Sequence, residues 1–201
     1  MSRAPRQERS EQKRREVLEA TLRLLAREGP RGVTHRAVAA EAGTSLRATT
    51  YYFASREELL TEALLHYART AIERFDIIRA PLSPGIEDPI EAAADLLAAT
   101  VVSDLLEDRA GLVAEYELVL EIGRNPVLEP AYREWQAKLE GMLGGYAALF
   151  GSRNPERDAR IVLATLRGLE LEALARPSRK PDRVELRGLF AALLATLVRS
   201  S

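Results

Sequence analysis

Apolar residues recur at spacings of three and four along almost the whole of this 201-residue chain, and no segment alternates with a period of two. Spacings of three and four place side chains on one face of an α-helix, whereas a half-buried strand requires alternation. Glycine and proline divide the pattern into about nine helical segments. The sequence therefore predicts an all-α fold.

The stretch from Thr44 to Leu60, TSLRATTYYFASREELL, combines a short polar and aromatic helix with the start signal of the next helix. In that signal the Ser55 hydroxyl is placed to accept from the N–H of Glu58, while the Glu58 side chain reaches back to the N–H of Ser55. Upstream, Thr34 to Gly43 indicates another capped helix that a glycine closes. Two short helices joined by a tight turn predict a helix-turn-helix, whose second helix usually reads DNA.

Breaker residues also indicate where the chain divides. The first helix is expected from about Ser10 to Arg27, with Gly29 and Pro30 after it, and the fourth helix from Ser55 to about Ile78. The segment Ala80 to Pro89 holds three prolines and a glycine, which are too many breakers for a helix. We therefore expect the main boundary of the chain in this segment.

Charge is divided along the chain in a way that the overall value of -1 conceals. Residues 1–56 hold 12 Lys and Arg against 6 Asp and Glu, a net charge of +6, whereas residues 57–201 hold 17 against 24, a net of -7. Only the N-terminal quarter has an electrostatic reason to approach phosphate.

The residue types present exclude several classes of function. The chain has no cysteine, and its two histidines, His35 and His66, have no neighbours that predict a catalytic triad or a metal site. We expect no catalytic residues, no metal and no cofactor, and so no enzyme. No apolar run reaches the roughly 18 residues that a membrane span needs, and the charged N-terminus lacks a secretory signal. The sequence predicts a cytoplasmic protein without a membrane partner.

A three-helix N-terminal unit, a long connecting helix and a larger helical part together resemble the TetR family of bacterial transcriptional repressors. The resemblance is specific over about Val17 to Leu64 and architectural elsewhere. Family members end the recognition helix in an aromatic-x-His-Phe sequence, followed by a Ser-Lys pair. Thr50 stands here for the usual aromatic residue and Tyr52 for the usual histidine. The matching positions are Thr50, Tyr51, Tyr52, Phe53, Ser55 and Arg56.

The third helix, expected from Ser45 to Tyr52, has two faces. Thr49 and Phe53 lie four residues apart and are predicted to face the core. Leu46, Arg47 and Thr50 project from the opposite face, where a recognition helix meets base edges. Arg47 suits a bidentate contact to guanine, worth about 1–3 kcal/mol of discrimination, and Leu46 and Thr50 suit a thymine methyl group. The alternative for Arg47 is a solvated side chain.

The resemblance assigns further residues to DNA. Arg36 is expected to contact a base or a phosphate, and Arg3, Arg6 and Arg9 form an arm that either reaches DNA or stays in solvent. For Arg56 the alternative is a surface ion pair with a nearby glutamate, Glu57 or Glu62. The expected backbone contacts are Thr34, His35, Ser45, Tyr51, Tyr52 and Arg56.

The resemblance also assigns tasks to the rest of the chain. It implies a DNA-binding domain over residues 1–55, with an arm at about 1–9, and a ligand-binding and dimerisation domain over residues 56–201. The expected ligand pocket comprises Tyr116, Glu117, Trp135 and Tyr146. The expected dimer interface, on the last two helices, comprises Gly168, Leu169, Leu189 and Leu193. The alternatives are an ordinary core for the aromatic residues, a solvated acidic face for Glu117 and a monomeric core for the last two helices.

These features predict a homodimeric repressor that binds a palindromic operator in double-stranded DNA and is released by a small-molecule effector. An activator would have the same sequence features. A helical small-molecule-binding protein or enzyme that retains a helix-turn-helix as scaffold is the main alternative. A ligand-independent DNA architectural protein is the second alternative.

Overall fold

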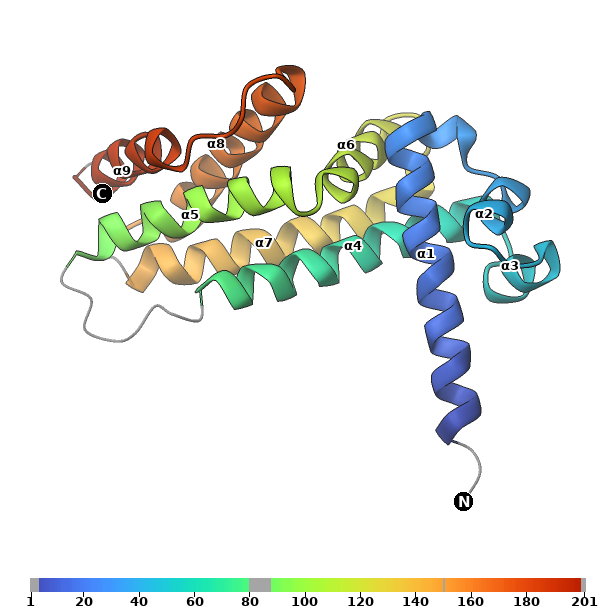
Figure 1. Cartoon of the computed structure of the whole chain (residues 1–201). Helices are drawn as coiled ribbons and strands as arrows, with labels where there is room; N and C mark the ends of the chain where they lie inside the picture. The colour runs from blue at the N-terminus through green and yellow to red at the C-terminus, as the bar shows by residue number, and fades with distance from the viewer. Residues whose placement is uncertain (1–3, 80–87, 150, 200–201) are drawn as a thin grey trace. The chain divides into compact units, whose positions relative to one another are not determined.

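The computed structural model describes residues 4–79, 88–149 and 151–199, with helices throughout and no strand in these ranges (Figure 1). The expected all-α fold is confirmed. Arg3 and residues 80–87 of the expected boundary segment lie outside the described residues, as does the side chain of Arg6. The elements are α1 (Ala4–Gly32), α2 (His35–Glu41), α3 (Leu46–Tyr52), α4 (Arg56–Arg79), α5 (Pro89–Leu106), α6 (Arg109–Ile122), a 3₁₀ turn (Pro126–Leu128), α7 (Glu129–Leu149), α8 (Pro155–Ala175) and α9 (Arg183–Arg199).

Polar side chains cap the starts of α2 and α3, at Thr34 as the sequence predicts and at Ser45, which the sequence predicts as the first helical residue. The Thr34 hydroxyl accepts from Ala37 N–H at 3.1 Å to cap α2, and the Ser45 hydroxyl accepts from Ala48 N–H at 3.1 Å to cap α3. Gly43 between these helices has φ +60°, a left-handed conformation that favours glycine. The helix-turn-helix geometry therefore follows from local sequence signals.

The capping box before α4 forms with one difference from the prediction. The Ser55 hydroxyl accepts from Glu58 N–H at 3.0 Å as expected, but the Glu58 carboxylate accepts from Ala54 N–H at 2.6 Å rather than from Ser55 N–H. The reason is the end of α3, whose last bond runs from Phe53 N–H to the Thr49 carbonyl at 3.0 Å. Phe53 itself is extended, with φ −137° and ψ 117°, so the N–H of the next residue, Ala54, leaves the helix and is available to Glu58.

The first helix begins at Ala4, six residues earlier than Ser10, so the residues expected to form an arm from position 4 onward are helical. Glutamine-to-glutamate hydrogen bonds at a spacing of four support these polar turns, from Gln7 to Glu11 at 3.3 Å and from Gln12 to Glu16 at 3.0 Å. At its other end α1 breaks at Gly29, where φ is 67°, as the Gly29-Pro30 pair predicts.

The chain packs as two compact units. The first comprises residues 1–70 and 110–133, so helix α6 belongs with the three N-terminal helices, and its core includes Leu25, Val38 and Leu60. The second comprises residues 71–109 and 134–201, in which α5 packs along α9 and α8. This division follows packing. The division into functional domains at residues 55 and 56 stays a prediction.

Candidate nucleic-acid interface and effector pocket

Helix α3 separates core residues from outward-facing residues. Thr49 and Phe53 are fully buried, which confirms their assignment to the core. The Thr49 hydroxyl donates to the Leu46 carbonyl at 2.8 Å and lies 3.4 Å from the His35 carbonyl of α2. On the other face Leu46 is 45% exposed, and Arg47 and Thr50 are exposed as well. The three proposed base-reading residues therefore share one accessible face of a firmly packed helix.

The two tyrosines at the end of α3 have different surroundings. Tyr51 is 80% exposed, whereas the Tyr52 hydroxyl is 3.2 Å from the Ser10 hydroxyl of α1. Their rings meet edge to face, with centroids 5.2 Å apart. Tyr51 is open to a phosphate, while Tyr52 joins the end of the recognition helix to α1.

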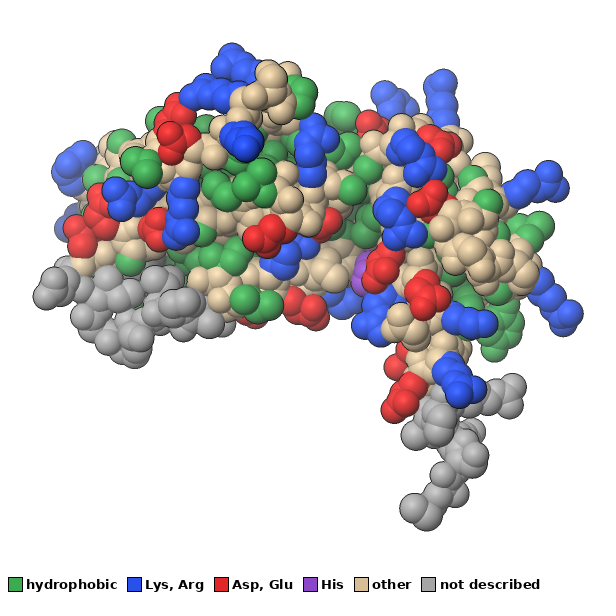
Figure 2. All heavy atoms as spheres, viewed as in Figure 1, with side chains coloured by type: hydrophobic (Ala, Val, Ile, Leu, Met, Phe, Trp, Pro, Cys, Tyr) green, Lys and Arg blue, Asp and Glu red, His purple; other side chains and the backbone are tan. Residues whose placement is uncertain are grey.

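The start of α2 presents the other predicted contacts. Arg36 is exposed, and none of the described ion pairs involves it or Arg47. The Thr34 hydroxyl is exposed but serves as the cap of α2, and His35 is half-buried. The buried Nδ1 atom of His35 has no hydrogen-bond partner among the described residues. Figure 2 shows Lys and Arg side chains projecting around the part of this unit that holds α2 and α3.

Arg56, a predicted phosphate contact, directs its guanidinium group at its own chain. Nε donates to the Val33 carbonyl at 3.1 Å, and Nη2 donates to the Pro30 carbonyl at 2.5 Å. Two carboxylates lie within 4 Å of the group, Glu57 at 3.8 Å and Glu121 at 3.9 Å. The alternative of an ion pair with Glu57 is therefore present, whereas Glu62 pairs with Arg14 instead. Sequence reasoning missed both carbonyl acceptors, which lie more than twenty residues away.

The predicted pocket residues are divided between the two units. Tyr116 and Glu117 lie in the first, where the Glu117 carboxylate is beside Gly29, and Trp135 and Tyr146 lie in the second. Trp135 is buried. Tyr146 lines a cavity of about 50 Å³, and its ring centroid lies 6.0 Å from that of Phe75. The other lining residues of the cavity are Ala93, Leu96, Leu97, Leu143, Ala147, Ala159, Val162 and Leu194.

A polar cluster in the second unit escaped the sequence analysis. Arg74 of α4 pairs with Asp104 at 3.0 Å and with Asp108 at 2.6 Å. The Asp104 carboxyl also forms a hydrogen bond with Glu170 of α8, a glutamate that is only 3% exposed. Burial raises the pKa of Asp104 above its ordinary value, although the adjacent Arg74 opposes this shift. No local pattern links residues 30 to 96 positions apart, so only the fold brings them together.

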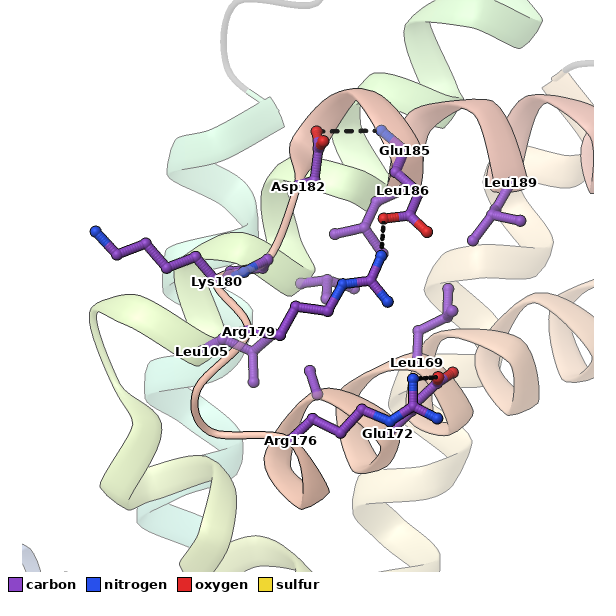
Figure 3. Close-up of a pocket in the computed structure, with 13 residues that line it drawn as sticks. Leu105, Leu169, Glu172, Arg176, Arg179, Lys180, Asp182, Glu185, Leu186 and Leu189 are labelled. Carbon is purple, nitrogen blue, oxygen red and sulfur yellow. Dashed lines mark hydrogen bonds and ion pairs between the residues drawn. The ribbon is translucent and has the colours of Figure 1, made fainter.

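The predicted dimer residues lie on open faces of α8 and α9. Gly168 is exposed, and a Cβ atom at this position would meet no other atom within 4 Å. Leu189 is 47% exposed, and Leu169 and Leu193 are partly exposed. Together, Leu169 and Leu189 line a pocket with Leu105 and Leu186 (Figure 3). Two ion pairs frame its rim, Arg176 with Glu172 at 3.0 Å and Arg179 with Glu185 at 2.6 Å.

Neither a membrane span nor a metal site is found within the described ranges. None of their helices is both long and apolar enough to cross a bilayer. Their His, Asp and Glu side chains form no group of three or more that could hold a metal ion.

A helix-turn-helix with an exposed outer face on α3, carried by an otherwise helical chain with a small apolar cavity, is typical of a DNA-binding regulator. Residues 17–63 match the family described as bacterial regulatory proteins, tetR family, and residues 88–199 match the tetracyclin repressor-like C-terminal domain. The chain belongs to the TetR family of transcription regulators.

Relatives and solved structures agree with this membership. The nicotine-responsive transcriptional repressor HdnoR of Paenarthrobacter nicotinovorans is 22% identical over 83% of this chain and 86% of its own length. The TetR-family member SCO1917 of Streptomyces coelicolor A3 is 32% identical, with a TM-score of 0.69 over 90% of this chain and 97% of its own. The multidrug binding protein EbrR complexed with ethidium is also 32% identical, with a TM-score of 0.65 over 90% and 98% of the chains.

The buried Asp104 predicts a pH-dependent contribution to stability. Because its pKa is raised on folding, the folded protein binds more protons than the unfolded chain just above pH 3.8. The contribution is complete below the unfolded pKa and is lost as the pH rises through the folded value. Asp104→Asn cannot titrate, so its free energy of unfolding relative to the wild type should increase as the pH rises from 4 to 7.

Urea unfolding at a fixed protein concentration measures this difference. Asp95→Asn is the control, because Asp95 pairs with Arg183 at the surface of the same unit. A free energy of unfolding of Asp104→Asn that falls relative to that of the wild type as the pH rises would contradict the prediction.

Proposed function

We propose that this protein is a homodimeric repressor that binds a palindromic operator and leaves it when a small-molecule effector binds. The observation that supports DNA reading best is the outer face of α3, where Leu46, Arg47 and Thr50 are accessible while Thr49 and Phe53 fix the helix in the core. A rigid helix with an open polar face suits the major groove. The net charge of +6 over residues 1–56 adds attraction to phosphate.

Dimerisation is required by the small size of the reading element. A single helix-turn-helix covers few base pairs, so a dimer that reads two half-sites gains both affinity and specificity. The exposed apolar residues of α8 and α9, together with the open backbone at Gly168, support these helices as the interface. A glycine inside a helix costs about 1 kcal/mol relative to alanine, a cost that close approach of a second backbone would offset.

The cavity at Tyr146 supports an apolar, ring-containing effector. Its lining is apolar, and Phe75 and Tyr146 offer two aromatic rings. Related proteins have ligands of this kind, since HdnoR is nicotine-responsive and EbrR is complexed with ethidium. The cavity of about 50 Å³ is far below the roughly 300–1,000 Å³ of typical ligand sites, so an effector must bind a more open state. The effector then has a higher affinity for the open state than for the closed state. Such a difference is the physical requirement for release of the protein from its operator.

Binding of the purified protein to DNA fragments that flank its own gene tests the function. We expect one protected palindrome in a footprint and an affinity that falls as salt rises. Arg47→Ala should relax specificity at one base pair per half-site by about 1–3 kcal/mol, measured by competition with single-base operator variants. Glu11→Ala on an exposed turn of α1 is the control. Unchanged base preference in Arg47→Ala would remove Arg47 from the reading face.

The dimer interface is tested at Gly168. Gly168 is exposed and a Cβ atom there meets nothing within 4 Å, so we expect the isolated subunit to accommodate a leucine side chain at this position. Gly168→Leu should therefore leave the subunit folded while it raises the dimer dissociation constant by about ten-fold or more. Sedimentation equilibrium measures the constant. Gly145→Leu in α7, at another position without neighbours within 4 Å, is the matched control, and equal effects of both variants would refute the assignment.

The effector cavity is tested with ethidium as the probe. Binding is measured without DNA by titration calorimetry, because this flat dye also stacks between base pairs. Tyr146→Ala should weaken binding by about five-fold or more through the loss of one aromatic contact. Tyr132→Ala in the same helix is the control, since Tyr132 does not line the cavity. Equal affinity of Tyr146→Ala and wild type for ethidium would exclude this cavity as the dye site.

A further inference from the structure

The end of α1 leaves backbone carbonyl groups that need donors. Gly29 departs from helical geometry with φ 67°, and Pro30 has no N–H to offer. The Pro30 carbonyl accepts from Val33 N–H at 3.2 Å and from Arg56 at 2.5 Å, and the Val33 carbonyl accepts from Arg56 at 3.1 Å. A single guanidinium group on α4 thus holds both ends of the turn that leads into α2.

We propose that Arg56 is a positioning residue that fixes the helix-turn-helix on α4 and α6, and that it makes no phosphate contact. The proposal rests on the proposed DNA-binding function and changes the role that family resemblance implies for Arg56. Arg56 then acts on operator affinity through the turn that it holds, while Tyr51 and Arg36 remain the accessible candidates for phosphate.

The donors and charge of Arg56 support this role. A guanidinium group has five N–H donors in a fixed plane. Nε and Nη2 donate to the two carbonyl oxygens, and Nη1 faces the Glu57 carboxylate at 3.8 Å. The side chain is 30% exposed, and its charge is already opposed by Glu57 and by Glu121. A phosphate would have to displace these partners. The Val33 carbonyl would then lose the guanidinium donor, and the Pro30 carbonyl would keep only the Val33 N–H.

Helix α6 enters the same cluster. Glu121 lies 3.9 Å from the Arg56 guanidinium group, and the Glu117 carboxylate lies 3.5 Å from the Cβ position of Gly29. Both glutamates are one helical turn apart on α6, which packs in the same compact unit as α1 to α3. Arg56 therefore joins the α1–α2 turn, the start of α4 and the end of α6. The orientation of α2 and α3 within this unit depends on that junction.

The salt dependence of operator binding distinguishes the two roles. Each phosphate contact contributes about 0.9 to the slope of log affinity against log salt concentration, so loss of one contact per subunit lowers the slope of a dimer by roughly 1.8. We expect Arg56→Ala to weaken operator binding about ten-fold with the slope unchanged. Arg36→Ala is the matched comparison for an accessible arginine in the same unit. A slope that falls in Arg56→Ala by the amount of a phosphate contact would overturn the proposal.

A lysine variant gives a second and independent test. Arg56→Lys keeps the positive charge, but an ammonium group lacks the planar arrangement of donors with which the guanidinium group reaches both the Pro30 and the Val33 carbonyl. We expect it to bind the operator as weakly as Arg56→Ala, and to speed amide hydrogen exchange in α2 and α3 of the free protein. Recovery of wild-type affinity by Arg56→Lys, with unchanged exchange, would show a phosphate contact instead.

Failure of the proposed function would look different. Wild-type protein without any salt-dependent DNA binding would refute the regulator itself, whatever the variants do. If Arg56→Ala does not fold, Arg56→Lys and its exchange pattern in the free protein still decide the role of Arg56.

Discussion

The carbonyl groups of Pro30 and Val33, which lack helical donors where α1 ends, are the constraint on which we propose that the first unit depends. Gly29 ends the helix by entering a conformation with positive φ, and the chain must then satisfy carbonyls that no helical N–H can reach. Arg56 supplies the donors from the first turn of α4. With the turn between α1 and α2 held in this way, Val33 and Val38 are buried, and the His35 carbonyl lies within hydrogen-bond distance of the Thr49 hydroxyl of α3. Under this proposal, the direction in which the outer face of α3 points follows from how one helix ends.

Helix α3 is too short to be stable by itself, because a helix of seven residues barely exceeds the length of its own nucleus. Its stability comes from the burial of Thr49 and Phe53, from the Ser45 cap and from the bond of Tyr52 to Ser10 on α1. These contacts use one face and both ends of the helix. The outer face is therefore not required for folding, which explains how Thr50 can stand for the aromatic residue usual in the family without loss of the fold.

Local sequence signals suffice for most of the fold and for half of the candidate site. Periodicity and capping residues predict a helix from Ser45 to Tyr52, and the structure has α3 at Leu46–Tyr52. The same period predicts which side chains of this helix face inward and which face outward. The two carbonyl acceptors of Arg56 and the two aspartates that pair with Arg74 could not be predicted, because they lie 23 to 34 positions away and no local pattern encodes such contacts. The early start of α1 was missed because polar pairs, rather than an apolar stripe, support its first turns.

The second unit suggests how an effector could alter DNA binding. Residues of α4, α5, α7, α8 and α9 line the cavity at Tyr146, and its volume of about 50 Å³ is too small for a ring compound unless these helices separate. A ring compound therefore binds the open state more tightly than the closed state, because only the open state has enough volume for it. A separation that displaces α8 or α9 would act through Val162 and Leu194, which are part of the lining. These two helices carry the proposed dimer contacts, so opening the cavity would change the relation of two subunits and, with it, the spacing of their recognition helices.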